Sequence, residues 1–163
     1  MIVVADTTPL ISLLKIRHFN ILKELYGTVH IPKSVYDELT LNTDFKDEAE
    51  IIKGADFLQV HTDISPEKVD LLRRATNLDL GESEAIILAD SEETKILLMD
   101  EARGRFVAQQ MNIPITGVIG VLAASYKQGL LSYEEIIGSI QIMKNTNRFI
   151  SERLYNLLLD LIK

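Results

Sequence analysis

Five short aliphatic runs recur along the chain, and longer segments of helical character lie between them. The runs are IVVA at 2–5, TVHI at 28–31, FLQV at 57–60, KILLM at 95–99 and IPIT at 113–116. They do not alternate cleanly between apolar and polar residues, which is typical of strands covered by helices on both faces. This order predicts an α/β fold, a three-layer α/β/α sandwich around a central, mainly parallel sheet of about five short strands.

Start and stop signals mark several of the helical segments. Ser65, Pro66 and Glu67 form a helix start, and Gly27 and Gly54 stand where helices should end. We expect helices at 8–16, 18–27, 32–41, 45–54, 65–76, 81–93, 102–111, 120–129, 132–144 and 151–163. The polar stretch at 145–147 predicts a break between the last two.

The composition excludes several classes of protein. A chain of 163 residues, of which 47% are hydrophobic, is expected to form one domain over 1–163 with a substantial core. The absence of cysteine excludes a disulfide framework and a thiolate zinc site. The net charge of −7 does not suggest a general phosphate-binding surface, although bound cations would reduce it. No signal-peptide or bilayer-spanning pattern is present, and we expect a cytoplasmic protein with no membrane partner.

Two of the expected strands end just before an acidic residue. Asp6 follows the run at 2–5, and Asp100 follows the run at 95–99. In an open α/β sheet, ligands bind beyond the carboxyl ends of the strands, so these carboxylates converge if the two strands are neighbours. Glu38, on the helix after the second strand, and Glu82, at the start of an apolar helix, have access to the same edge.

Carboxylates gathered in this way suit a hard divalent cation. Mg²⁺ and Mn²⁺ prefer oxygen ligands, and a pair of such ions can activate water and stabilise the leaving oxygen of a phosphodiester. Without a metal the carboxylates repel one another. Each acid also has a structural alternative: Asp6 and Asp100 could cap the helices that follow them. Glu38 could be a solvated helix residue, and Glu82 a favourable charge in a first helical turn.

Four segments occur in an order that is specific to one family: ADTTPLISL, IPKSVYDEL, LDLGESEAIILA, and LLMDEARGRFVA with GVIGVLAASYKQGLL. In these segments the chain resembles PIN-domain proteins, the metal-dependent ribonucleases that include the VapC toxins of toxin–antitoxin pairs. It resembles more closely their prokaryotic relatives catalogued as a domain of unknown function. The resemblance covers a core at about 1–131, and the C-terminal helices at 132–163 add a weaker match.

The resemblance implies a role for each acid. The family places acids after the first strand, on an early helix, on a central helix and after a later strand, which here are Asp6, Glu38, Glu82 and Asp100. These would be the catalytic residues and the ligands of Mg²⁺ or Mn²⁺. Thr7 or Thr8 matches a supporting hydroxyl that often follows the first acid, and Glu101 could substitute as a ligand. Many VapC proteins carry Asp at the position of Glu82, so this chain departs from the pattern there.

Partners are implied as well. The resemblance implies an RNA substrate cut to leave a 5′-phosphate, a homodimer and, for toxin members, an antitoxin protein that enters the acidic cleft. Arg103 and Arg105 lie within one helical turn of Asp100 and could bind a substrate phosphate, or they could pair with Glu101. An apolar stripe is a candidate partner surface, although we expect it to pack on the protein's own core: Leu154, Leu157, Leu158 and Leu161.

Other acidic α/β enzymes fit the sequence less well. Haloacid-dehalogenase-type phosphatases need a second acid two residues after the first, where this chain has Thr8. A receiver domain needs paired acids after its first strand and a Lys near its last, and the run at 113–116 leads into Gly117 without one. The alternative from another class is a catalytically weak or inactive scaffold that binds protein or RNA.

The remaining charged side chains are expected to have structural roles. Glu84 is offset from the face of Glu82 and is expected to be solvated. Arg73 and Arg74 are expected to be surface charges. The three histidines show no metal-ligand spacing, and we expect them to be structural: His18, His30 and His61.

Overall fold

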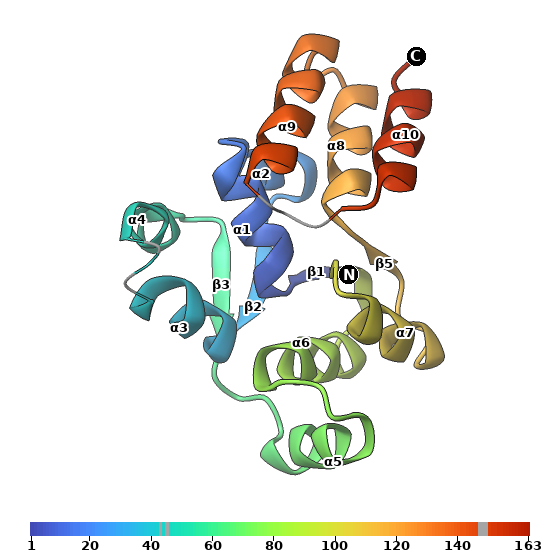
Figure 1. Ribbon diagram of the computed structural model, residues 1–163. Helices are drawn as coiled ribbons and strands as arrows, with labels where there is room; N and C mark the ends of the chain where they lie inside the picture. The colour runs from blue at the N-terminus through green and yellow to red at the C-terminus, as the bar shows by residue number, and fades with distance from the viewer. Residues whose placement is uncertain (43, 45, 147–149) are drawn as a thin grey trace.

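The computed structural model describes the whole chain except residues 43, 45 and 147–149. Its centre is a five-stranded, all-parallel sheet in the order β3-β2-β1-β4-β5 (Figure 1). The strands are β1 Ile2–Ala5, β2 Val29–Pro32, β3 Leu58–His61, β4 Thr94–Leu98 and β5 Ile115–Thr116. Strand order runs outward from β1 to β3 and then restarts at β4 on the other side of β1. The point where the order reverses therefore lies between β1 and β4, where open α/β sheets form their ligand crevice.

Ten helices lie in the described part of the chain. They are α1 Thr7–Lys15, α2 Ile21–Tyr26, α3 Lys33–Leu41, α4 Lys46–Gly54, α5 Pro66–Thr76, α6 Leu80–Ser91, α7 Ala102–Gln110, α8 Val118–Lys127, α9 Tyr133–Asn145 and α10 Glu152–Leu161. The predicted element boundaries hold to within a few residues for most of them. The expected start at 45 and the polar residue at 147 lie outside the described residues. None of the described helices is both long and apolar enough to cross a membrane.

Alternate residues of the central strands point to opposite faces of the sheet. Val3 and Ala5 of β1 join a core formed with α1, α2, α3, α8, α9 and α10, whereas Val4 and Met99 join a second core formed with α6 and α7. Helices α8, α9 and α10 stand together at the top of Figure 1, and α5 and α6 lie at the bottom. The predicted three-layer α/β/α sandwich is therefore confirmed, and burial on both faces explains why the strands lack clean alternation.

The last helix, α10, buries a different face from the one we predicted. Its buried residues are Tyr155 and Leu158, and Ile162, just after the helix ends, is buried as well. Of the predicted stripe only Leu158 is buried, whereas three leucines remain 42%, 49% and 41% exposed: Leu154, Leu157 and Leu161. The expectation that the stripe packs on the protein's own core is therefore wrong for these three. The helix is turned so that Tyr155 packs inward, where Lys144 of α9 lies 5.0 Å from its ring centroid.

Two of the histidines meet on neighbouring strands. His30 on β2 and His61 on β3 lie with Nδ1 and Nε2 2.7 Å apart, the distance of a hydrogen bond. Burial and the facing His61 imidazole both lower the pKa of His30. This contact could not be predicted from the sequence. The two histidines lie far apart along the chain, and only the parallel pairing of β2 with β3 brings them together.

Candidate functional site

Asp6 and Asp100 lie at the point where strand order reverses. Strands β1 and β4 are parallel neighbours with Ala5 opposite Leu98, and the Asp6 amide donates to the Leu98 carbonyl at 2.9 Å. Asp6 follows β1 directly and Asp100 lies two residues beyond the end of β4. The condition stated above, that these two strands are neighbours, is met, and both acids lie at the carboxyl edge of the sheet.

The Asp6 side chain is buried among other carboxylates. It is only 3% exposed, and although it stands at the N-cap position of α1 it makes no side-chain capping hydrogen bond. Burial raises the pKa of its carboxyl from 3.8 to about 7, the Thr7 amide opposes the rise, and Glu82, Asp79 and Glu38 add to it. The side-chain capping hydrogen bond that the structural alternative requires is not formed.

Asp100 is held by the start of another helix. Its Oδ1 and Oδ2 accept from the Val118 amide of α8 at 3.1 and 3.3 Å. It does not cap α7, whose N-cap residue is Glu101. Burial raises the pKa of Asp100, while the Val118 amide and the Arg105 guanidinium lower it. Gly117 leaves room for this arrangement, because a Cβ there would overlap Asp100 Oδ1.

Glu82 takes part in a capping box at the start of α6. Asp79 Oδ1 accepts from the Glu82 amide at 2.8 Å, and Glu82 Oε2 accepts from the Asp79 amide at 3.1 Å. Glu82 is 8% exposed, and burial raises its pKa, as do the neighbouring charges of Asp79 and Glu101. Glu82 therefore stabilises the first turn of a buried helix, and its carboxylate also contributes negative charge to the surroundings of Asp6.

Two threonines link the remaining acids to this edge. Thr7 Oγ1 donates to Glu38 Oε2 at 2.8 Å, and Thr8 Oγ1 donates to Glu101 Oε1 at 3.3 Å. Thr7 is buried, whereas Glu38 is exposed on α3. The hydroxyls that follow Asp6 therefore hold Glu38 and Glu101 near the two strand ends.

Asp79 is a member of this acidic group that our sequence reasoning missed. The signal was present, because an acid followed three residues later by Glu is a capping-box pattern. We expect Asp79→Ala to lower the free energy of unfolding by about 1 kcal/mol, since it removes the side-chain acceptor at the start of α6. Urea unfolding measures this. Asp90→Ala, in the exposed last turn of the same helix, is the matched control, and equal loss in both variants would contradict the capping role.

The donor set fits a hard cation in its chemistry. Asp6, Glu38, Glu82 and Asp100 offer oxygen atoms alone, and the charges that act on Asp6 are all acidic. Yet no three His, Asp or Glu side chains, in the part of the chain that is described, are grouped closely enough to hold a metal ion. Their oxygens are engaged pairwise by Thr7, Asp79 and Val118. A cation here would therefore bind through the oxygens of Asp6 and through the remaining acceptor sites of the other three carboxylates.

The two arginines that follow Asp100 both bind backbone carbonyls. Arg103 Nη2 donates to the Thr76 carbonyl at 2.7 Å, and Arg105 Nη1 donates to the Met99 carbonyl at 2.8 Å. Among the described residues neither forms an ion pair with Glu101, although the charge of Arg105 acts on the neighbouring Asp100. Their predicted role in phosphate binding stays a prediction.

Glu84 differs from our expectation of a solvated side chain. It is half-buried between α3 and α6, and burial raises its pKa, whereas the Ser34 hydroxyl and the Arg73 charge lower it. The difference arises because α3 packs against α6 and covers the face that a lone helix would leave open. Arg73 and Arg74 are exposed, as expected.

The comparisons with known proteins agree with this architecture. A family model described as a PIN domain matches residues 2–163, which includes α9 and α10 as well as the strands that carry the acids. No curated protein and no solved structure matches the chain at a significant level. Because the family model spans nearly the full sequence, the chain belongs to the PIN-domain family.

Proposed function

We propose that the protein is a metal-dependent ribonuclease that hydrolyses phosphodiester bonds at the edge formed by Asp6 and Asp100. PIN domains are generally nucleases, and this chain has their nuclease-type fold. One observation carries the proposal: Asp6 is a buried carboxylate without a capping role, surrounded by the charges of Glu38, Asp79 and Glu82. A fold does not keep such a group for stability, because burying uncompensated negative charge destabilises it.

Four acids would act jointly as ligands of the cation: Asp6, Glu38, Glu82 and Asp100. When bound, Mg²⁺ or Mn²⁺ supplies a water nucleophile at neutral pH and offsets the charge of the phosphodiester. The Val118 amide orients Asp100 and the Thr7 hydroxyl orients Glu38. Arg105 lies near Asp100, and we propose that it and Arg103 exchange their carbonyl partners for a substrate phosphate.

Calorimetric titration of Mn²⁺ into the metal-free protein tests the site. We expect saturable binding in the wild type and at least about tenfold weaker binding in both Asp6→Asn and Asp100→Asn. Because burial holds a proton on Asp6 up to about pH 7, binding at pH 6 should release protons, and this release should be smaller in Asp6→Asn. Two buffers of different ionisation enthalpy measure it. Asp90→Asn is the exposed control, and absence of binding in the wild type would overturn the proposal.

A protein- or RNA-binding scaffold is the second candidate. It is favoured by the contacts that already satisfy Glu82 and Asp100 within the protein, and by the lack of a three-ligand group among the described side chains. RNA binding that is insensitive to Mn²⁺, without cleavage, would support it. The toxin role, the antitoxin, the homodimer and the cytoplasmic location stay predictions. The exposed leucines of α10 form a surface on which a partner could pack.

A further inference from the structure

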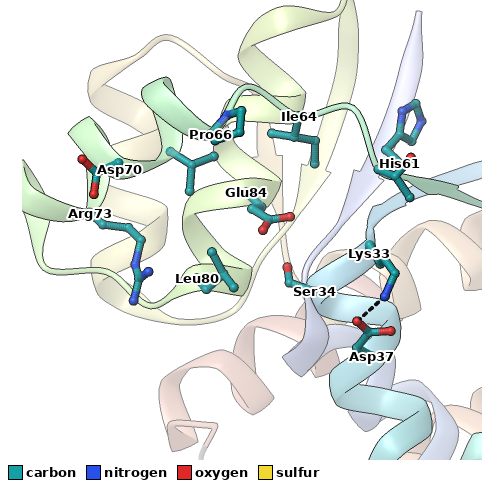
Figure 2. A pocket seen from close by; sticks show the side chains of 12 residues that line it. Lys33, Ser34, Asp37, His61, Ile64, Pro66, Asp70, Arg73, Leu80 and Glu84 are labelled. Atoms are coloured by element: carbon teal, nitrogen blue, oxygen red, sulfur yellow. Dashed lines mark hydrogen bonds and ion pairs between the residues drawn. The ribbon is translucent and has the colours of Figure 1, made fainter.

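A cavity of about 430 Å³ opens beside the acidic edge. It lies between the start of α3, the segment after β3, and helices α5 and α6 (Figure 2). Ile64, Val69 and Leu80 give it apolar walls. Polar and charged side chains line the rest of the cavity: Lys33, Ser34 and Asp37 on α3, His61 and Thr62 at the end of β3, Asp70 and Arg73 on α5, and Glu84 on α6. A cavity of this volume, with apolar walls and several polar groups that converge on it, can hold a small ligand or one nucleotide.

The cavity adjoins the proposed catalytic edge through two helices. Ser34 lies one turn before Glu38 on α3, about 6 Å along the helix axis. On α6, Glu84 lies two residues after Glu82, and the two helices approach at Gly81, where a Cβ would stand 3.7 Å from both Glu38 Oε2 and Asp79 Oδ1. A single strand of RNA that crosses the acidic edge toward β3 would therefore bring a neighbouring nucleotide over this cavity.

Glu84 decides which base the cavity can accept. Figure 2 shows its carboxylate in the middle of the cavity, pointing from α6 toward Ser34 on α3. A carboxylate presents two acceptor oxygens side by side and no donor. Guanine presents two adjacent donors, N1–H and N2–H, on its Watson–Crick edge. Uracil, cytosine and adenine each place an acceptor beside the donor, so none of them can bond to both oxygens.

Two basic residues also line the cavity, Lys33 and Arg73. Arg73 of α5 lines the cavity near Leu80, and in the described part of the chain its guanidinium makes no hydrogen bond or ion pair, although its charge acts on Glu84. Lys33, at the start of α3, is engaged with Asp37 at 2.7 Å. Arg73 is therefore the cation best able to bind an incoming phosphate, because its fork of donors matches phosphate oxygens.

We propose that this cavity is a guanine-specific nucleotide subsite, with Glu84 accepting from the Watson–Crick edge of the base and Arg73 binding its phosphate. As a subsite for RNA it rests on the proposed ribonuclease function, but its capacity to bind a guanine nucleotide does not. Leu80 and Ile64 cover the faces of the base, and Ser34 completes the polar floor. The subsite selects RNA in which a guanosine lies next to the cleaved bond.

Guanosine 5′-monophosphate, titrated into the full metal-free chain, tests the proposal directly. We expect saturable shifts of the Ile64, Val69 and Leu80 methyl signals in NMR spectra, and at least about tenfold weaker binding of uridine 5′-monophosphate. Glu84→Gln should weaken guanosine binding by about tenfold or more and remove the preference, since the amide offers one acceptor and a donor. Arg73→Ala should weaken the binding of both nucleotides by the same factor.

Matched controls are available on the distant helices α9 and α10. Glu134→Gln and Arg153→Ala change exposed side chains of the same type and should leave both affinities unchanged. Equal affinities for the two nucleotides, or no shift of the cavity methyls up to about 10 mM, would overturn the subsite. The two proposals fail separately: guanosine binding without RNA cleavage leaves the subsite standing, and cleavage with no preference for guanosine removes the subsite alone.

Discussion

Asp6→Asn is expected to abolish RNA cleavage and, at the same time, to stabilise the metal-free protein at alkaline pH. Loss of cleavage follows because the amide supplies a neutral group where the proposed site needs a carboxylate. The gain in stability follows because Asp6 is buried with no capping hydrogen bond and is surrounded by acids. A residue kept only for structure would not give opposite effects on activity and stability.

The pH dependence of this gain has a defined sign. Burial raises the pKa of Asp6 from 3.8 to about 7, so the folded state binds the proton more tightly than the unfolded state does. The contribution of Asp6 to stability is therefore fully present below about pH 4 and is lost as the pH rises through about 7. Above that pH the ionised carboxylate lowers the free energy of unfolding by up to about 4 kcal/mol. A neutral Asn side chain has no such effect.

Urea unfolding at pH 5 and pH 8 measures this difference. We expect the free energy of unfolding of Asp6→Asn to exceed that of the wild type by about 2–4 kcal/mol at pH 8 and by much less at pH 5. Asp90→Asn removes an exposed carboxylate and should show no such pH-dependent gain. If a pure Asp6→Asn sample retained cleavage, the proposed mechanism would be wrong. If the difference in stability did not depend on pH, the pKa of Asp6 would not be raised in the folded protein.

The position of Asp6 and Asp100 at one edge of the sheet could be predicted from the sequence because it depends on local patterns. Each acid follows a short aliphatic run, and parallel strands bring their carboxyl ends to one edge. The sequence could not show that β1 and β4 are neighbours. The match of the four quoted segments to one family supported that pairing before the structure showed it.

The contacts of these acids were harder to predict, since they depend on how separate elements meet. Asp100 accepts from Val118, which lies far along the chain, and this bond exists only because β5 returns the chain beside β4. Glu84 is half-buried because α3 covers it, and α10 turns Tyr155 inward in place of the leucine stripe. A single helix has an apolar face that sequence periodicity reveals, but its rotation against neighbours is decided by packing.

Gly117→Ala is the substitution expected to damage the site most without touching an acid. Gly117 has φ −122° and ψ −169°, an extended conformation that alanine adopts freely, so the backbone is not strained. The added Cβ would overlap Asp100 Oδ1 and lie 3.3 Å from Arg105 Nη1. Asp100 must then swing away from the Val118 amide, which we expect to cost about 1–3 kcal/mol of stability. Because the acid is misplaced by an ångström or more, cleavage should fall at least about 100-fold.

Gly138→Ala separates this crowding from a general effect of replacing glycine. Gly138 lies within α9, where no atom stands within 4 Å of an added Cβ, so alanine should raise stability by about 0.5–1 kcal/mol through its higher helix propensity. Urea unfolding and RNA cleavage are measured for both variants under the same conditions. Opposite changes in stability, with cleavage lost in Gly117→Ala alone, would show that the position of the Asp100 carboxylate governs the chemistry. Full cleavage in Gly117→Ala would remove Asp100 from the catalytic site, because its carboxylate cannot keep its present place once the Cβ is added.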